Sequence, residues 1–334
     1  MIKNYLKFLL ASIACVLLTT AALPQQMPYS SHYIFNRYTL DPAFAGAYDK
    51  AAVYLNYRRD WGNIEGSPQT FRANGFGSVY RNMYLGGEIN VDNTDIYNRL
   101  KANLSYTYRL PLANEQNLSF SVSGNLYQSV IRFDKVNADL NDPLLKDISR
   151  ITGTNFNAAF GLIYNWRDLH IGVGMPVLFR TQDTYQAKAE GKFAFDRAFL
   201  LHISNRFYLE DRWQLQLFAV YQKTDNTPSV VDISATVFYD DKYHFGLLYR
   251  SGNALAIGLG GQLIDNFMLG YSYEFGLGGI LTGSGGAHEI TVGYRIPALN
   301  QNQTSKSGIN QNKRPIAPLR PVGNSPRPVD FNRR

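Results

Sequence analysis

Apolar and polar side chains alternate at every second position along most of the chain between residues 51 and 297. In the segments 102–110, 118–126, 267–275 and 289–296, Leu, Val, Ile, Phe and Tyr alternate with Ser, Asn, Thr, Arg or Glu. This period of two predicts β-strands with one apolar face. We expect fourteen strands, near 51–61, 69–80, 83–92, 98–111, 116–131, 155–165, 169–179, 197–208, 212–223, 229–240, 243–251, 253–264, 266–276 and 287–297.

Three features favour a membrane barrel over a soluble β-sandwich, which would also alternate. The apolar face is rich in aromatic residues, drawn from 23 Tyr and 20 Phe, and tyrosines near strand ends suit the headgroup level of a bilayer. The opposite face carries Ser, Asn, Thr and Gln, which suit a water-filled lumen. Many strands reach ten residues, about the length that crosses a membrane. The sequence therefore predicts an all-β fold, a transmembrane antiparallel β-barrel of about 14 strands.

Short and long connections alternate between the expected strands. Short turns at one end and long loops at the other are typical of an outer-membrane barrel, and an even strand count leaves no open edge. We expect the loops 132–154 and 180–196 to lie outside the cell. The chain termini and the short turns would then be periplasmic. The short turns are expected at 81–82, 111–115, 167–168, 210–211, 240–242 and 265.

The chain begins with features of an export signal. Lys3 and Lys7 precede a short apolar run that ends in small residues near Ala22, so residues 1–22 are interpreted as a signal peptide. Cys15, the one cysteine, lies inside this run. It admits an alternative interpretation as a lipoprotein cysteine, but a cleavable signal leaves a mature chain without cysteine. The remaining divisions are a pre-barrel periplasmic segment at 23–50, the barrel at 51–297 and a tail at 298–334.

Positive charge is concentrated at the C-terminus. Of the formal net charge of +7, residues 298–334 carry +6, and the body from 23 to 297 holds 24 basic against 25 acidic groups. No basic face that would suit nucleic acid is indicated. The tail is rich in Gln, Asn and Pro, so we expect it to be disordered. It is either a solubilising extension or a binding segment for a periplasmic partner or an anionic surface, through Lys313, Arg314, Arg320, Arg327, Arg333 and Arg334.

No pattern of catalytic or metal-binding residues emerges. The five histidines have no metal-ligand spacing. His202 and Ser204 share one strand face, which we expect to line the lumen because Leu201 and Ile203 face lipid. The Gly-rich stretch 258–261 is not followed by a helix, so it is interpreted as small residues that make room in the lumen. We therefore expect no enzyme activity, cofactor or metal.

Three stretches before and around the first strand form a distinctive block: "YSSHYIFNRYTLDPAFAGAYD", "VYLNYRRDW" and "GSPQTF". Together they resemble the opening of the PorP/SprF family of outer-membrane proteins. Asp41 stands where the family usually has Asn, and Gln69-Thr70 follow the proline. Asp is also a turn-starting residue, so the pattern is preserved. The positions that match the family motif are Phe35, Asn36, Asp41, Pro42, Ala43, Phe44, Gly46, Arg58, Trp61 and Pro68.

This resemblance implies a role in the type IX secretion and gliding machinery of Bacteroidota. It implies export or surface attachment of large, adhesin-like cargo proteins with a C-terminal sorting domain. The implied partners are outer-membrane lipid, that cargo, and a periplasmic secretion-machinery or peptidoglycan-linked protein. The motif either tucks into the periplasmic mouth of the barrel, contacts a partner, or simply leads the chain into the first strand. The rival function is a passive porin or small-solute transporter.

Overall fold

The computed structural model describes residues 30–113, 115–132, 150–182, 184–185, 194–251, 254–277, 283 and 285–297. The predicted signal peptide, the predicted tail with the six basic residues proposed for partner binding, and most of the two long loops lie outside these residues. Within the described ranges, no helix is long and apolar enough to cross a membrane.

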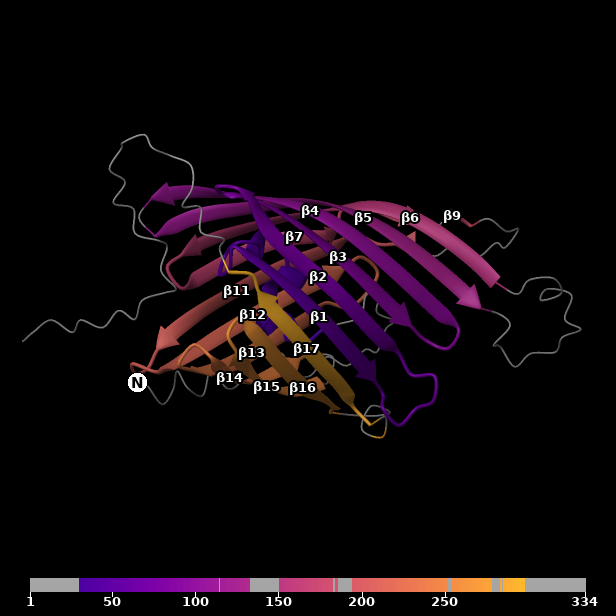
Figure 1. Cartoon of the computed structure of the whole chain (residues 1–334). Coiled ribbons are helices and arrows are strands. Elements are labelled where there is room, and N and C mark those ends of the chain that lie inside the picture. Colours follow the sequence, from indigo (N-terminus) through magenta and orange to yellow (C-terminus); the bar gives the residue numbers. More distant parts are fainter. Residues whose placement is uncertain are drawn as a thin grey trace, which may run out of the picture.

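Fourteen long antiparallel strands form a closed barrel (Figure 1). Each strand pairs with its neighbours in the chain, and β1 pairs with β17 to close the wall. Three two-residue strands, β8 (Thr181–Gln182), β9 (Thr184–Tyr185) and β10 (Ala194–Phe195), lie beyond the end of β7. The barrel strands are β1 (Ala51–Asp60), β2 (Gln69–Tyr80), β3 (Met83–Asn93), β4 (Tyr97–Ala113), β5 (Gln116–Arg132), β6 (Arg150–Trp166), β7 (Leu169–Val177), β11 (Ala198–Tyr208), β12 (Trp213–Thr224), β13 (Val230–Tyr239), β14 (Tyr243–Arg250), β15 (Ala254–Ile264), β16 (Phe267–Gly276) and β17 (Ala287–Arg295).

The predicted fold class and the predicted strand count are confirmed. Most boundaries fall within two residues of the expected ones. The exception is β6, which begins at Arg150 instead of 155. Its first residues pair with the last residues of β5 at the long-loop end, where Arg132 lies opposite Arg150. A long β5 needs an equally long partner, because unpaired backbone groups are costly in a membrane wall.

The alternation of the strands separates an outer from an inner face. Leu104 on β4 is 69% exposed, whereas its neighbour Ser105 is 2% exposed because it faces the lumen. Leu201 and Ile203 point outward and His202 and Ser204 point inward, as expected. The exposed apolar side chains form the surface that contacts lipid.

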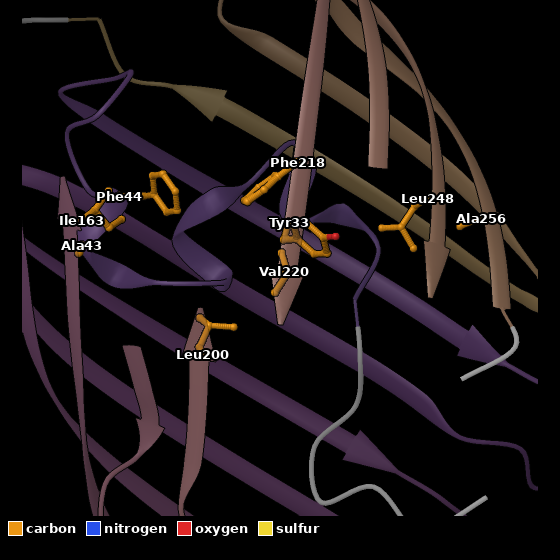
Figure 2. Close-up of a cluster of buried hydrophobic side chains, with 9 residues drawn as sticks. All are labelled: Tyr33, Ala43, Phe44, Ile163, Leu200, Phe218, Val220, Leu248 and Ala256. Carbon is orange, nitrogen blue, oxygen red and sulfur yellow. The ribbon is translucent and has the colours of Figure 1, made fainter. Parts of the chain in front are cut away.

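The lumen is occupied by the chain's own N-terminal part, residues 30–50, which we call the plug segment (Figure 1). It forms three short 3₁₀ helices, η1 (His32–Ile34), η2 (Arg37–Thr39) and η3 (Pro42–Phe44). The expectation of a water-filled lumen is therefore wrong over this region. Plug and wall share an apolar cluster inside the barrel (Figure 2), made of Tyr33, Ala43, Phe44, Ile163, Leu200, Phe218, Val220, Leu248 and Ala256.

Candidate functional site: the lumenal plug

The sequence of the plug segment dictates its tight turns. Asp41 has an extended backbone, and its Oδ1 accepts a hydrogen bond from the backbone N–H of Ala43 at 2.8 Å. Pro42 follows as the first residue of η3, where its missing N–H costs nothing. Asp41 thus caps the helix as a turn-starting residue should. Gly46 ends the turn with a φ of +73°, which favours glycine.

Asp41 is the point where the plug meets the wall most closely. The carboxylate is buried between Gly161 on β6 and Gly174 on β7. A Cβ atom at position 161 would lie 2.0 Å from Asp41 Oδ1. Ser121 on β5 donates to the same oxygen at 3.4 Å, and His202 Nε2 lies 3.7 Å from Oδ2. The carboxylate of Asp41 therefore fits against the wall only because Gly161 and Gly174 have no side chains.

The aromatic residues of the plug segment lie over other inward-facing glycines. The Tyr38 ring covers Gly86 on β3, and its hydroxyl bonds Ser105 Oγ at 2.7 Å. The Phe35 ring lies over Gly270 on β16, 2.9 Å from where a Cβ would be. Within the Gly-rich stretch 258–261, Gly258 on β15 also borders the Phe35 ring, which lies 3.7 Å from where a Cβ would be.

The end of the plug is tied to the wall at the short-turn end of the barrel. The carbonyl of Gly46 accepts from Arg109 Nη1 at 2.6 Å. Asp49 forms an ion pair with Arg295 at 3.4 Å, just before β1 begins. Burial raises the pKa of the Asp49 carboxyl, and the charge of Arg295 opposes that shift. The chain is thus fixed on both sides of the turn into β1.

The beginning of the plug segment is held toward the long-loop end by buried carboxylates. The backbone N–H of Ser31 donates to Glu289 on β17 at 2.8 Å, and its hydroxyl donates to Glu274 on β16 at 2.9 Å. The hydroxyl of Ser30 also donates to Glu289. Both glutamates lie two residues from the loop end of their strands. Ser30, the first described residue, therefore lies nearer the loops than the rest of the plug.

Two buried arginines balance these carboxylates. Arg58 forms ion pairs with Glu274 at 3.0 Å, Glu289 at 3.3 Å and the neighbouring Asp60. Arg250 on β14 binds Asp232 with two hydrogen bonds of 3.0 Å and reaches Glu274 at 3.1 Å. Paired and hydrogen-bonded charges of this kind are tolerated in a buried site, whereas single ones are not. We call this set the loop-side ion network.

A small cavity, which we call the loop-side cavity, remains between the plug segment and the loop-side part of the wall. Its volume is about 130 Å³, and the plug contributes Ser30, Tyr33 and Leu40 to its lining. The wall contributes a charged group on β3 and β4, in which Lys101 pairs with Glu88 at 3.0 Å. Among the described residues, no set of three His, Cys, Asp or Glu side chains is placed to hold a metal.

The structure brings most of the sequence-predicted motif together, but not all of it. Phe35, Asn36 and the residues from Asp41 to Gly46 lie in the plug segment. Arg58 joins the same site indirectly, through the carboxylates that hold Ser30 and Ser31. Trp61 and Pro68 lie apart, in the β1–β2 loop, where the Pro68 carbonyl accepts from Asp60 N–H at 2.9 Å.

The wall residues that complete the site were not predicted, although some left a signal. Glu274 and Glu289 stand on the polar face of otherwise Ser, Gly and Thr-rich strands. A buried carboxylate on the lumen face needs a cationic partner. Arg58 on β1 could have been predicted as that partner. The glycines under Asp41 and Tyr38 gave no sign of a plug in the sequence. Glycines that face inward are equally compatible with an open lumen.

A closed fourteen-stranded barrel with an apolar outer face defines this chain as an outer-membrane β-barrel protein. Residues 22–294 match the family described as type IX secretion system membrane protein PorP/SprF. The chain belongs to that family. This is a family of secretion-system membrane proteins and indicates no enzyme.

Two solved transporter structures are similar to this chain at low sequence identity. The toluene transporter TbuX of Ralstonia pickettii is 13% identical, with a TM-score of 0.50 over 78% of this chain and 93% of that one. The toluene transporter TodX of P. putida is 9% identical, with a TM-score of 0.45 over 76% and 91%. The search of curated proteins gave no match.

Proposed function

We propose that this protein is an accessory barrel of the type IX secretion and gliding machinery that holds partner proteins rather than conducting solutes. It would support export or surface attachment of large, adhesin-like cargo with a C-terminal sorting domain. The observation that carries the proposal is the plug segment. Residues of the family motif occupy the lumen, where a porin would need open space.

The contacts of the plug segment support a lumen that stays occupied. Tyr33, Tyr38 and Phe44 are each at most 4% exposed, and burial of one such side chain contributes about 1.5–3 kcal/mol. The plug interacts with β2 to β7 on one side and with β11, β12 and β14 to β17 on the other. Anchorage around most of the wall favours a fixed element over a hinged gate.

The proposed orientation places the short turns in the periplasm and the long loops outside the cell. The described chain ends at Pro297, next to the short turns, so the tail would start in the periplasm. It would there reach a secretion-machinery or peptidoglycan-linked protein. The loops 132–154 and 180–196 would face the cargo. On the N-terminal side, Ser30 itself lines the loop-side cavity.

The rival function, a passive porin or small-solute transporter, has one observation in its favour, the loop-side cavity. Conductance separates the two functions. The purified protein in a planar bilayer should show no steady current if the plug closes the lumen. A steady open pore would favour the rival.

The accessory function itself is tested in the cell. Cargo carrying the C-terminal sorting domain should co-purify with the barrel, whereas the same cargo without that domain should not. A strain lacking the barrel should lose surface-attached cargo and regain it on complementation. Normal surface attachment in the deletion strain would refute the proposal.

A further inference from the structure

The outer face of the barrel carries a polar row at the loop end of four neighbouring strands. Arg59 on β1 lies opposite His288 on β17 and opposite Gln69 on β2. His288 in turn lies opposite Tyr273 on β16. Arg59, His288 and Gln69 are exposed, and because all four residues alternate with inward-facing neighbours, they form one row on the lipid side.

Two tyrosines stand one step deeper and point their hydroxyls at this row. Tyr57 on β1 donates to Gln69 Oε1 at 3.2 Å. Tyr271 on β16 bonds His288 Nδ1 at 2.8 Å. One further step toward the middle of the membrane, the apolar side chains of Leu55 on β1 and Val292 on β17 lie opposite each other. Cation, tyrosine and aliphatic levels in this order match the passage from headgroups to hydrocarbon.

The charge of this row is unbalanced. Within the described part of the chain, no carboxylate lies within ion-pair distance of Arg59, whereas its inward neighbour Arg58 has three. An arginine on a lipid-facing strand is costly unless its guanidinium reaches an anion at the interface. The planar guanidinium is well suited to phosphate, which it can bind with two parallel hydrogen bonds.

His288 is positioned to assist Arg59. Its ring lies 4.8 Å from the Tyr273 ring, and the bond to Tyr271 occupies Nδ1. In the tautomer in which Tyr271 donates to Nδ1, the proton of the imidazole is on Nε2, which is then a donor for a further ligand. Arg59 and His288 are cross-strand neighbours, so one anionic group can contact both.

We propose that Arg59 and His288 form a binding site for the phosphate headgroup of a membrane lipid. The ligand class is an anionic phospholipid or lipid A at the level of the long loops. Gln69 and the hydroxyls of Tyr57 and Tyr271 complete the polar surroundings. Such a site fixes the rotation and depth of this side of the barrel in the membrane.

Native mass spectrometry of the folded barrel tests this site. The barrel is incubated separately with lipid A, phosphatidylglycerol and phosphatidylcholine, and retained lipid is counted. Anionic lipid should be retained over phosphatidylcholine. Because one interfacial arginine contributes about a fivefold preference for anionic lipid, Arg59→Gln should lower retention about fivefold, and Arg59→Gln with His288→Gln should lower it further.

The matched control is Arg212→Gln, which removes an exposed arginine in a short turn, where it already pairs with Asp240. It should leave lipid retention unchanged, and heat-modifiable migration on a gel shows that each variant is folded. Equal retention of anionic lipid by the wild type and the double variant would overturn the proposal. Complete displacement of the lipid by equimolar inorganic phosphate would also overturn it, since the site would then bind free phosphate.

Discussion

Adding one methyl group at Gly161 should loosen the plug segment without touching the outer face. A Cβ at this position would lie 2.0 Å from Asp41 Oδ1 and 2.6 Å from its carboxyl carbon. Asp41 must therefore leave its place between β6 and β7. Gly124 on β5 provides the matched control, because a Cβ there meets nothing within 4 Å.

The magnitude of the effect on plug opening follows from two losses. Overpacking costs about 1–3 kcal/mol, and loss of the Asp41 cap on Ala43 costs about 1 kcal/mol. Replacing glycine by alanine within a strand also stabilises the wall by about 0.5–1 kcal/mol, but equally in the plugged and the open state, so this gain cancels in both Gly161→Ala and Gly124→Ala. The net effect of Gly161→Ala is about 2 kcal/mol against the plugged state, which is about thirtyfold in its opening equilibrium.

Hydrogen exchange followed by mass spectrometry measures this equilibrium at the plug. The amides of Ala43 and Phe44 are bonded to Asp41 and exchange when the plug opens. In Gly161→Ala they should exchange about thirtyfold faster than in the wild type, whereas Gly124→Ala should leave them unchanged. Equal protection in the two folded variants would refute the placement of Asp41.

Three further predictions concern the wall, the loops and the tail. Leu104→Arg should cost about 2–4 kcal/mol as a charge near the middle of the lipid face. Ser121→Arg should also lower the heat-modifiable folded fraction, because the plug occupies the space that a water-filled lumen would have offered. Normal folding of Leu104→Arg would contradict the assignment of the lipid face, and normal folding of Ser121→Arg would contradict the occupied lumen. An epitope inserted at Asp142 should be labelled by antibody on intact cells; labelling only after permeabilisation would invert the orientation. Deletion after Pro297 should leave a folded barrel but weaken co-purification of a periplasmic partner at low salt, less so at high salt. Undiminished partner recovery would make the tail a passive extension.

The barrel could be predicted from the sequence because each strand carries its own signal. The period of two placed Leu104 outside and His202 inside without any knowledge of their neighbours. The short turns and the even strand count then closed the wall. Only the start of β6 was misplaced. Its first residues alternate less clearly between apolar and polar side chains than the residues of β5 with which they pair.

The plug site could not be predicted in the same way, because it depends on contacts between residues far apart in the chain. Asp41 meets Gly161, and Ser31 meets Glu289. No local pattern links these pairs. The family resemblance marked Asp41 and Arg58 as members of one motif, but only the structure shows that the wall carboxylates connect Arg58 to Ser31.

The central claim, that the barrel supports secretion with its lumen occupied, is tested most directly by locking the plug in place. Asp41→Cys with Gly161→Cys puts two Cβ atoms at most about 4 Å apart, in range for a disulfide in the oxidising envelope. The predicted mature chain has no other cysteine. Cells whose only copy is the locked barrel should display cargo with the C-terminal sorting domain as wild-type cells do. Loss of cargo display that a reductant restores would contradict the account, because the plug would then have to move for the protein to work.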